Sequence, residues 1–376
     1  MTTPLAQEIR LLIAAEGPMP VSRYMALCLG HPRHGYYITR DPLGARGDFT
    51  TAPEISQMFG ELIGLWAVAA WQQMGMPDPV RLVELGPGRG TLMADALRAA
   101  RLVPAFGAAA RIHLVETSPV LRQAQARALA AHEGGVSDRV SDRVSWHLRI
   151  EDVPAGPAIV LANEFFDALP VDQYVWTVTG WHERRVGLGP DGRLTFGLDP
   201  APSRAAPALA AHLPPPAPGA VLEVMESGPA RALSARLAAE GGIALAIDYG
   251  HAGGHGDTLQ ALKAHRFADP LAEPGAADLT AHVDFARLAL LGREAGLKAF
   301  GPLEQGDFLA RLGLAARAER LMRDAEPKAA DTIATAARRL AGTGDGEMGR
   351  LFKVLALAHP QLGSPPAFDP SEEFTR

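Results

Sequence analysis

The sequence of 376 residues has a single cysteine, Cys28, and only four lysines. One cysteine excludes an internal disulfide bond and any cysteine-rich zinc site. Because Cys28 lies in the apolar run from Tyr24 to Leu29, we expect it to be a small buried hydrophobic residue. With so few lysines, arginine carries almost all of the positive charge, which is typical of a GC-rich, bacterial genome.

The sequence also lacks a basic excess, a long apolar run and a metal-binding pattern. Its formal net charge of -6 and pI near 6.1 argue against extended binding to nucleic acid and favour a cationic substrate. No stretch of about 18 apolar residues is free of charge, and residues 1–20 have no basic region followed by an apolar stretch. We therefore expect a cytoplasmic protein without an integral membrane segment. No close pair of histidine or carboxylate residues has ligand spacing, so no metal is predicted, and the oligomeric state stays open.

Short apolar runs alternate with helical stretches from Val80 onward. This alternation is typical of βαβ units and predicts an α/β fold with a Rossmann-like core and a mostly parallel sheet. The expected core strands are 80–85, 111–116, 144–147, 158–163, 220–225, 242–248 and 351–357. The expected helices lie near 90–101, 118–131, 228–239, 282–295 and 306–324.

Composition divides the chain into four parts. Residues 1–75 are predicted to form an N-terminal helical and lid region, with the glycine-punctuated segment from His31 to Ser56 as the lid. Residues 76–199 and 220–359 are predicted to form the core, with inserted β-hairpins. Residues 200–219 are an Ala/Pro-rich insertion, and residues 360–376 are predicted to be a loose C-terminal tail.

A glycine-rich loop between an apolar strand and an amphipathic helix is the strongest local signal. Its glycines let the backbone approach a ligand, and the helix that follows offers free N–H groups. The third glycine comes too early for the dinucleotide spacing G-x-G-x-x-G, and Glu84 would repel a phosphate but accept the cationic S-adenosylmethionine. The residues predicted to bind that cofactor are Glu84, Gly86, Pro87, Gly88, Gly90 and Thr91.

Two further carboxylates follow the next core strands. Glu116 ends strand 111–116, where an acid in dinucleotide folds accepts hydrogen bonds from ribose hydroxyls, and adenosine presents the same diol. We predict that Glu116, with Thr117 and Ser118 beside it, contacts the cofactor; the alternative is that Glu116 caps the following helix. Asp152, after the third strand, lies where an adenine amino contact is expected.

Polar residues also follow the fourth core strand. Asn163 and Glu164 come directly after its apolar run, and side chains at this end of a parallel strand face the reaction crevice. We predict that Asn163 contacts the cofactor, and that Asn163 and Glu164 set the transferred methyl group against its acceptor. In the competing interpretation, Asp167 is a turn residue, and Phe165 and Phe166 belong to the core.

The chain resembles the MidA family of class I S-adenosylmethionine-dependent methyltransferases over nearly its full length. Several separate stretches carry the resemblance, and their conjunction is more specific than any one of them. These are Gly35-Tyr36-Tyr37, Gly47 to Ser56, Phe59-Gly60-Glu61, Glu84 to Thr91, Glu116 to Pro119, Asn163 to Pro170, Ile247 to Gly250, Asp257 to Gln260, Ala277 to Asp284 and Met348 to Lys353.

This resemblance implies a class I core with a seven-stranded sheet and a protein arginine as the acceptor. The mitochondrial members are arginine methyltransferases needed for assembly of respiratory complex I, so a complex I subunit is a candidate substrate. Carboxylates can hold a guanidinium bidentately. Glu164 is the first candidate for this role, and Glu54, Asp48 and Asp248 are second choices.

Asp48 and Thr51, in the predicted lid, are also expected to contact the cofactor. Two other functions stay open: an assembly factor that binds S-adenosylmethionine without turnover, and a Rossmann oxidoreductase.

Overall fold

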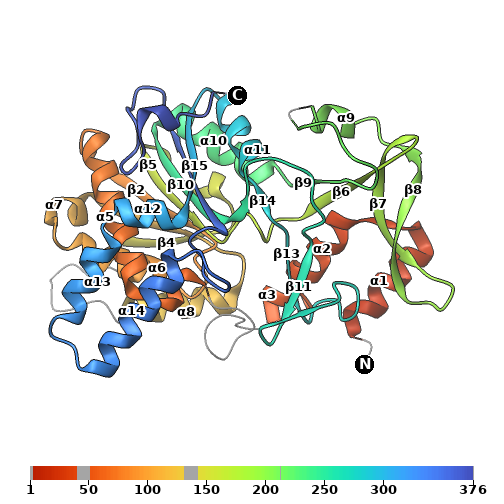
Figure 1. Cartoon of the computed structure of the whole chain (residues 1–376), viewed down its shortest axis with the longest axis horizontal. Coiled ribbons are helices and arrows are strands. Elements are labelled where there is room, and N and C mark those ends of the chain that lie inside the picture. Colours follow the sequence, from red (N-terminus) through yellow and green to blue (C-terminus); the bar gives the residue numbers. More distant parts are fainter. Residues whose placement is uncertain (1–2, 40–50, 131–142, 212, 376) are drawn as a thin grey trace. The chain divides into compact units, whose positions relative to one another are not determined.

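The computed structural model describes residues 3–39, 51–130, 143–211 and 213–375 (Figure 1). The chain divides into two compact units. The mixed unit comprises Met1–Phe49, Phe166–Glu226 and His251–Asp284, and the core unit comprises Thr50–Phe165, Ser227–Gly250 and Phe285–Arg376. These boundaries differ from the four predicted parts, because the chain leaves the core twice to build the mixed unit and returns each time.

The core unit contains a mostly parallel sheet. Its strands are β2 (Val80–Leu85), β3 (Ala110–Val115), β4 (Val144–His147), β5 (Ala158–Asn163), β10 (Gly242–His251), β15 (Lys298–Glu304) and β16 (Phe352–Ala358). They lie in the order β15-β16-β10-β5-β2-β3-β4, and only the β10–β16 and β16–β15 pairs along this order are antiparallel. The predicted Rossmann-like fold with a mostly parallel sheet is confirmed; the sheet has eight strands rather than seven, and the eighth, β14 (Val283–Asp284), lies off this order.

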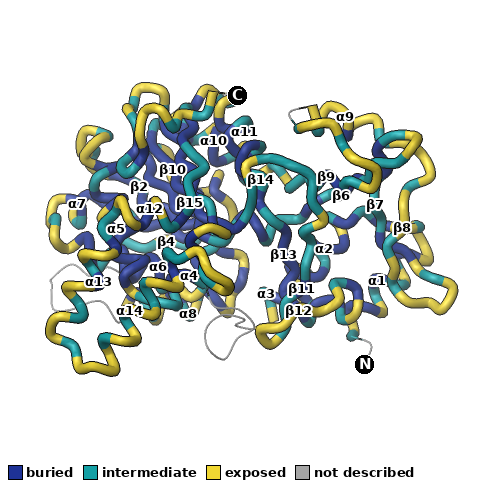
Figure 2. Tube along the Cα trace, viewed as in Figure 1, coloured by how far each residue is buried: buried dark blue, intermediate teal, exposed yellow. Residues whose placement is uncertain are grey.

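The centre of this sheet is buried on both faces. Every residue of β5 is buried, and Figure 2 shows β2 and β10 in the buried colour as well. Strands covered on both sides read as continuous apolar runs in the sequence. This is why most of the core strands could be predicted nearly to the residue.

Helices cover the sheet of the core unit. They are α4 (Ala52–Ile55), α5 (Gln57–Gln73), α6 (Thr91–Ala100), α7 (Pro104–Ala109), α8 (Pro119–Ala130), η2 (Ile150–Asp152), α10 (Gly228–Glu240), α11 (Phe285–Glu294), α12 (Gln305–Arg311), α13 (Leu314–Met322), α14 (Pro327–Ala341) and η3 (Pro370–Glu372). The helix predicted over 306–324 is two helices, because Gly313 adopts a left-handed conformation with φ 88°. The predicted loose tail is tied to the core unit through the Arg311–Glu372 ion pair and the Phe374 N–H bond to the Ala299 carbonyl.

The mixed unit is built from short helices and two smaller antiparallel sheets. Its helices are α1 (Pro4–Glu16), α2 (Val21–Gly30), α3 (Tyr36–Thr39) and α9 (Ala206–Leu209). Its strands are β1 (Met19–Pro20), β6 (Val171–Thr177), β7 (Gly180–Leu188), β8 (Leu194–Pro202), β9 (Val221–Met225), β11 (Gln260–Lys263), β12 (Arg266–Ala268), β13 (Asp278–Thr280) and β14 (Val283–Asp284). The strand predicted at 220–225 as part of the core is β9, which pairs with β6 in this unit.

The apolar faces of α1 and α2 supply the main core of the mixed unit. Ile9, Tyr24 and Met25 are fully buried there, in one cluster with Val186 of β7. Cys28 belongs to the same cluster, as expected for a small buried hydrophobic residue. None of the helices that the structure describes is both long and apolar enough to cross a membrane.

Candidate active site

The core sheet has a topological switch point beside β2. From β2 the chain passes through α6 to β3 and then β4 on one side, and it returns to β5 on the other side. In open α/β sheets, ligands bind in the crevice outside the carboxyl ends of the strands at such a point. Three of the predicted residues lie at this edge: Glu84 near the end of β2, Glu116 directly after β3, and Asn163 at the end of β5.

The glycine loop after β2 needs its glycines for conformation and for space. Gly86, Gly88 and Gly90 have φ values of 59°, 53° and 84°, in the left-handed region that favours glycine. A Cβ atom on Gly86 would lie 2.9 Å from the Phe165 ring, and one on Gly90 would lie 3.1 Å from the Gln125 Cα. The loop therefore packs closely against residues after β5 and on α8, and it opens α6 at Thr91.

Two buried acceptor atoms lie beside this loop. Glu84 is only 3% exposed. Neither the Glu84 Oε2 atom nor the Asn163 Oδ1 atom has a hydrogen-bond partner among the described residues. Burial, and secondarily the charge of Glu116, raise the pKa of Glu84 to about 8. A buried carboxylate and a buried amide oxygen that both lack donors suit a ligand that brings N–H donors and positive charge.

Glu116 is held by local hydrogen bonds. Its Oε1 accepts the Ser118 N–H at 2.7 Å, and its Oε2 accepts Gln125 Nε2 at 3.1 Å. The Ser118 hydroxyl in turn accepts the Leu121 N–H at 3.3 Å and so caps α8. Helix capping falls to Ser118, while the two bonds that Glu116 accepts leave further lone pairs on its carboxylate. Thr117 between them is exposed.

Gln125 is a site residue that sequence reasoning missed. It is fully buried on α8, donates to the Gly88 carbonyl at 2.7 Å and to Glu116, and accepts the Trp146 indole N–H at 2.9 Å. One amide therefore links the glycine loop, the acid after β3 and strand β4. The signal was present in the sequence, because Gln125 falls between Leu121 and Leu129 on the buried face of the helix.

We expect Gln125→Leu to lower the free energy of unfolding by about 1–3 kcal/mol, because the Trp146 indole and the Gly88 carbonyl lose their partner. Cofactor affinity should fall as well, since the loop loses this support. Urea unfolding and calorimetry measure the two effects. Gln123→Leu is the matched control, because Gln123 is exposed on the same helix. Equal stability of both variants would contradict the linking role.

Glu164 has an unusual backbone conformation for its residue type. Its φ is 50°, in the left-handed region, and its N–H donates to the Ile247 carbonyl of β10 at 2.8 Å. Its Oε1 accepts the Ala52 N–H at 2.9 Å and Asn163 Nδ2 at 3.1 Å. A non-glycine residue in this region costs about 1–3 kcal/mol, and such residues cluster at functional sites.

Two of the second-choice carboxylates, Asp248 and Glu54, belong to the core unit. Asp248 is buried on β10 one residue beyond Ile247, which is paired with Asn163, so it is close to Glu164 in register. Glu54 of α4 accepts the hydroxyl of Thr91, at the start of α6, in a short hydrogen bond. Thr51 is the N-cap residue of α4. The structure thus brings Glu54, Thr91, Glu164 and Asp248 into the core unit.

One described residue of the prediction, Asp152, stands apart from this group. Asp152 is exposed, and its carboxylate accepts the Arg149 N–H within its own turn. Asp48 lies outside the described residues, as does much of the predicted lid. Of the two phenylalanines, Phe166 is fully buried, as the competing interpretation expected, and Phe165 packs beside Gly86.

A family model of S-adenosyl-L-methionine-dependent methyltransferases matches residues 62–303. The chain belongs to this methyltransferase family. The match runs from within α5 through the glycine loop, Glu116, Glu164 and Asp248. The predicted membership of a methyltransferase family, and S-adenosylmethionine as the cofactor, are thereby confirmed.

Relatives named as protein arginine methyltransferases cover most of the chain. The protein arginine methyltransferase NDUFAF7 homolog, mitochondrial, of Drosophila melanogaster is 40% identical over 94% of this chain and 84% of its own length. The human protein arginine methyltransferase NDUFAF7, mitochondrial, is 37% identical over 85% of this chain and 76% of its own length.

A solved structure of a methyltransferase-like protein also matches this methyltransferase throughout. It comes from Burkholderia thailandensis and is bound to S-adenosyl-homocysteine. It has a TM-score of 0.81 and 29% identity, and the match covers 96% of this chain and 94% of that one. The resemblance therefore extends over both units, each of which has its counterpart in that protein's chain.

Proposed function

We propose that this methyltransferase transfers a methyl group from S-adenosylmethionine to a guanidino nitrogen of arginine in a protein. The observation that carries the proposal is the position of Glu164, a carboxylate in a left-handed conformation at the carboxyl end of β5, beside the cofactor strand. The names of the relatives supply the acceptor class. A respiratory complex I subunit is a candidate substrate, and the bacterial origin and cytoplasmic location stay predictions.

The residues at the switch point fit the two ends of the cofactor. Glu84 Oε2 and Asn163 Oδ1, two buried acceptors for which no described residue supplies a donor, would accept hydrogen bonds from the amino group. Glu116 has lone pairs left for the ribose hydroxyls. The glycine loop would lie against the methionine part of the cofactor, with Thr91 and Thr51 nearby. Asp152 and Asp48 stay predicted cofactor contacts.

In the transfer itself the enzyme contributes alignment. The cofactor supplies an activated methyl group on a cationic sulfur, and the acceptor must lie in line with it at close distance. Glu164 would hold the guanidinium through charged hydrogen bonds, orient one nitrogen and accept the proton that this nitrogen loses. The Ala52 N–H and the Asn163 amide fix the carboxylate in place. Asp248 and Glu54 are the next candidates.

The proposal is tested by incubating the purified chain with methyl-labelled S-adenosylmethionine and an extract of the source organism that lacks this gene. We expect label on arginine in a small number of polypeptides, located by mass spectrometry. Cofactor binding without any transfer would instead favour the assembly-factor function. Label on residues other than arginine would show that the acceptor is a different type of side chain.

The raised pKa of Glu84 gives a second test. The free carboxyl with a pKa of about 8 is mainly protonated between about pH 5.5 and 7, whereas an ammonium group binds the charged form. We therefore expect cofactor affinity to rise with pH in this range, by at most about tenfold per pH unit. The free protein should show the opposite trend in stability. Between the ordinary pKa of 4.5 and about 8 the folded state holds the extra proton, so its free energy of unfolding falls as pH rises.

Calorimetry from pH 5.5 to 7 measures the affinities. S-adenosyl-homocysteine is the matched ligand control, because it keeps the amino group and lacks the sulfonium, so its affinity should have the same pH slope. Glu84→Gln should flatten both slopes. If the variant keeps the wild-type slope, Glu84 does not bind the amino group.

A further inference from the structure

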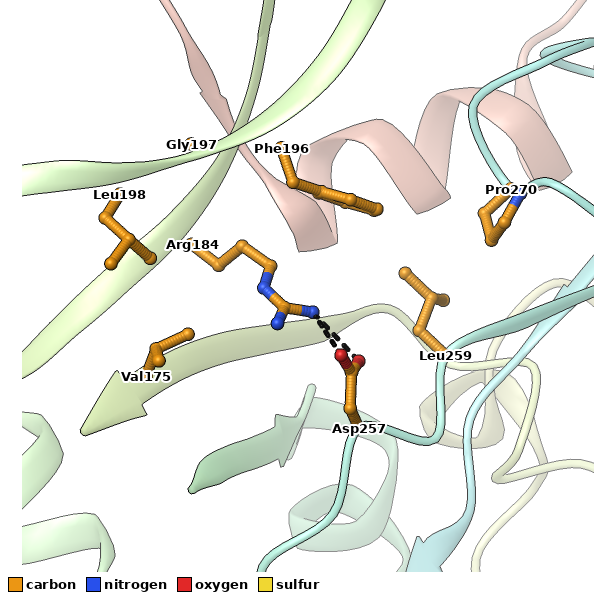
Figure 3. Close-up of a pocket in the computed structure, with 8 residues that line it drawn as sticks. All are labelled: Val175, Arg184, Phe196, Gly197, Leu198, Asp257, Leu259 and Pro270. Atoms are coloured by element: carbon orange, nitrogen blue, oxygen red, sulfur yellow. Dashed lines mark hydrogen bonds and ion pairs between the residues drawn. The ribbon is translucent and has the colours of Figure 1, made fainter. Parts of the chain in front are cut away.

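A cavity of about 550 Å³ opens in the mixed unit (Figure 3). Its walls come from strands β6, β7 and β8, from the segment before β11 and from the segment after β12. The lining residues are Val175, Arg184, Phe196, Gly197, Leu198, Asp257, Leu259 and Pro270. The volume lies within the range of about 300–1,000 Å³ that is usual for ligand sites.

A charged pair crosses this cavity. Arg184 Nη1 donates to both carboxylate oxygens of Asp257 at 2.8 Å, and the Arg184 guanidinium lies 5.4 Å from the centre of the Phe196 ring. Arg184 Nη1 also donates to Gln173. These contacts hold the guanidinium in one orientation, and its Nε and Nη2 groups have no hydrogen-bond acceptor among the residues that the structure describes. The Asp257 side chain is 49% exposed, so the pair offers both donors and acceptors to a ligand.

The segment that carries Asp257 is itself held in place by a half-buried carboxylate. Glu223 on β9 accepts the Thr258 and Leu259 N–H groups at 3.1 and 3.2 Å, and Gln173 Nε2 links Glu223 to Asp257. The segment that carries Asp257 and Leu259 is therefore fixed by hydrogen bonds rather than by packing alone. This part of the cavity lining is therefore preformed.

The third wall is a strand with an open edge. β8 pairs with β7, and no other described strand pairs with β8. The Gly189 N–H donates to the Arg193 carbonyl at the turn, so regular alternation of the antiparallel ladder directs the backbone N–H and C=O groups of Phe196 and Leu198 to the open side. Pro200 and Pro202 limit this edge to the first part of β8, because proline has no N–H to donate.

We propose that this cavity and the open edge of β8 together dock an extended segment of the protein substrate. The segment would pair with Phe196 and Leu198 as an added strand and place one apolar side chain in the cavity, while Arg184 and Asp257 bond to its peptide groups. Strand addition takes affinity from the main chain and specificity from such side-chain pockets. The inference rests on the proposed protein-methylating function and adds to it how the substrate is held.

The observations favour a polypeptide segment over a second copy of this chain. A peptide group carries one N–H donor and one C=O acceptor. Asp257 can accept from the N–H, and Arg184 can donate to the C=O. The open edge between Leu194 and Asp199 is only a few residues long. Together with one cavity it would bury far less than the roughly 1,200 Å² of a stable interface between proteins.

The test compares Leu198→Asp with Thr195→Asp. Leu198 is 46% exposed and lines the cavity, whereas Thr195 is exposed on the opposite face of the same strand, so both variants add one charge to β8. The probe is the most strongly labelled polypeptide from the extract experiment, purified and methylated by each variant. We expect Leu198→Asp to raise KM at least tenfold with kcat within about twofold, and Thr195→Asp to match the wild type. Leu198→Met, which keeps an apolar side chain, should also match the wild type.

Calorimetry with S-adenosylmethionine checks that each variant is folded and binds cofactor equally well. Unchanged KM in Leu198→Asp would overturn the docking proposal and leave the methyltransferase proposal standing. A wild-type dimer that becomes a monomer in Leu198→Asp, seen by light scattering, would assign the edge to a second copy and also overturn it. If the wild type labels no arginine in any polypeptide, the proposed function fails and the docking proposal with it.

Discussion

Gly88→Val is expected to abolish binding of S-adenosylmethionine while the chain stays folded. Gly88 has a φ of 53°, so a β-branched residue there is strained by about 1–3 kcal/mol and will move the peptide out of this conformation. Its carbonyl is also the acceptor for Gln125, so the movement disturbs the link to Glu116. The added side chain would also crowd the contact that we propose between the cofactor and this loop. Calorimetry should show a loss of affinity of about 10²-fold or more.

Gly75→Val is the control that distinguishes the effect of backbone strain from the effect of damage to the cofactor site. Gly75 has a φ of 82° in the same unit, and no atom lies within 4 Å of the position that a Cβ would take. Both variants should therefore lose a similar amount of stability in urea unfolding, but only Gly88→Val should lose the cofactor. Retained affinity in Gly88→Val would move the cofactor away from this loop.

The parts of the site that were predictable are those with a local signal. A strand, a glycine-rich turn and a helix follow one another between Val80 and Ala100, and each has its own periodicity or residue requirement. The acids at strand ends were predictable for a similar reason, because parallel strands place their carboxyl ends at one edge. The order of strands around β2 then brought Glu84, Glu116 and Asn163 together as expected.

Features that depend on contacts between distant parts of the chain, or that have no local sequence signal, were not predictable. β9 follows a loop and resembles a core strand in sequence, yet it pairs with β6, because strand pairing is decided by tertiary packing. The helix break at Gly313 could not be told from a tolerated glycine. The Arg184–Asp257 pair joins residues far apart in the chain, and neither residue type in its local sequence indicates a cavity. The left-handed conformation of Glu164 likewise has no sequence signal, since glutamate rarely adopts it.

At Glu164 we expect a substitution to change the rate of methyl transfer without changing the affinity for the cofactor. Glu164→Gln keeps the size and the hydrogen-bonding shape of the side chain, and its amide oxygen can still accept the Ala52 N–H. It removes the charge that would orient a guanidinium and the base that would take its proton. Cofactor affinity should stay within about threefold, while the transfer rate falls by roughly 10² or more, the usual scale for a positioned acid or base.

Single-turnover transfer at saturating S-adenosylmethionine measures the rate, and calorimetry measures the affinity. Asn163→Asp is the contrasting variant at the neighbouring position: it replaces a proposed cofactor contact and should change affinity more than rate. Its added carboxylate also removes the Asn163 Nδ2 donor to Glu164, so some loss of rate is expected as well. If Glu164→Gln instead loses cofactor affinity and keeps its rate once saturated, Glu164 belongs to the cofactor pocket. The orientation of the acceptor then falls to Asp248, which is buried on β10, or to Glu54 of α4, which accepts the Thr91 hydroxyl.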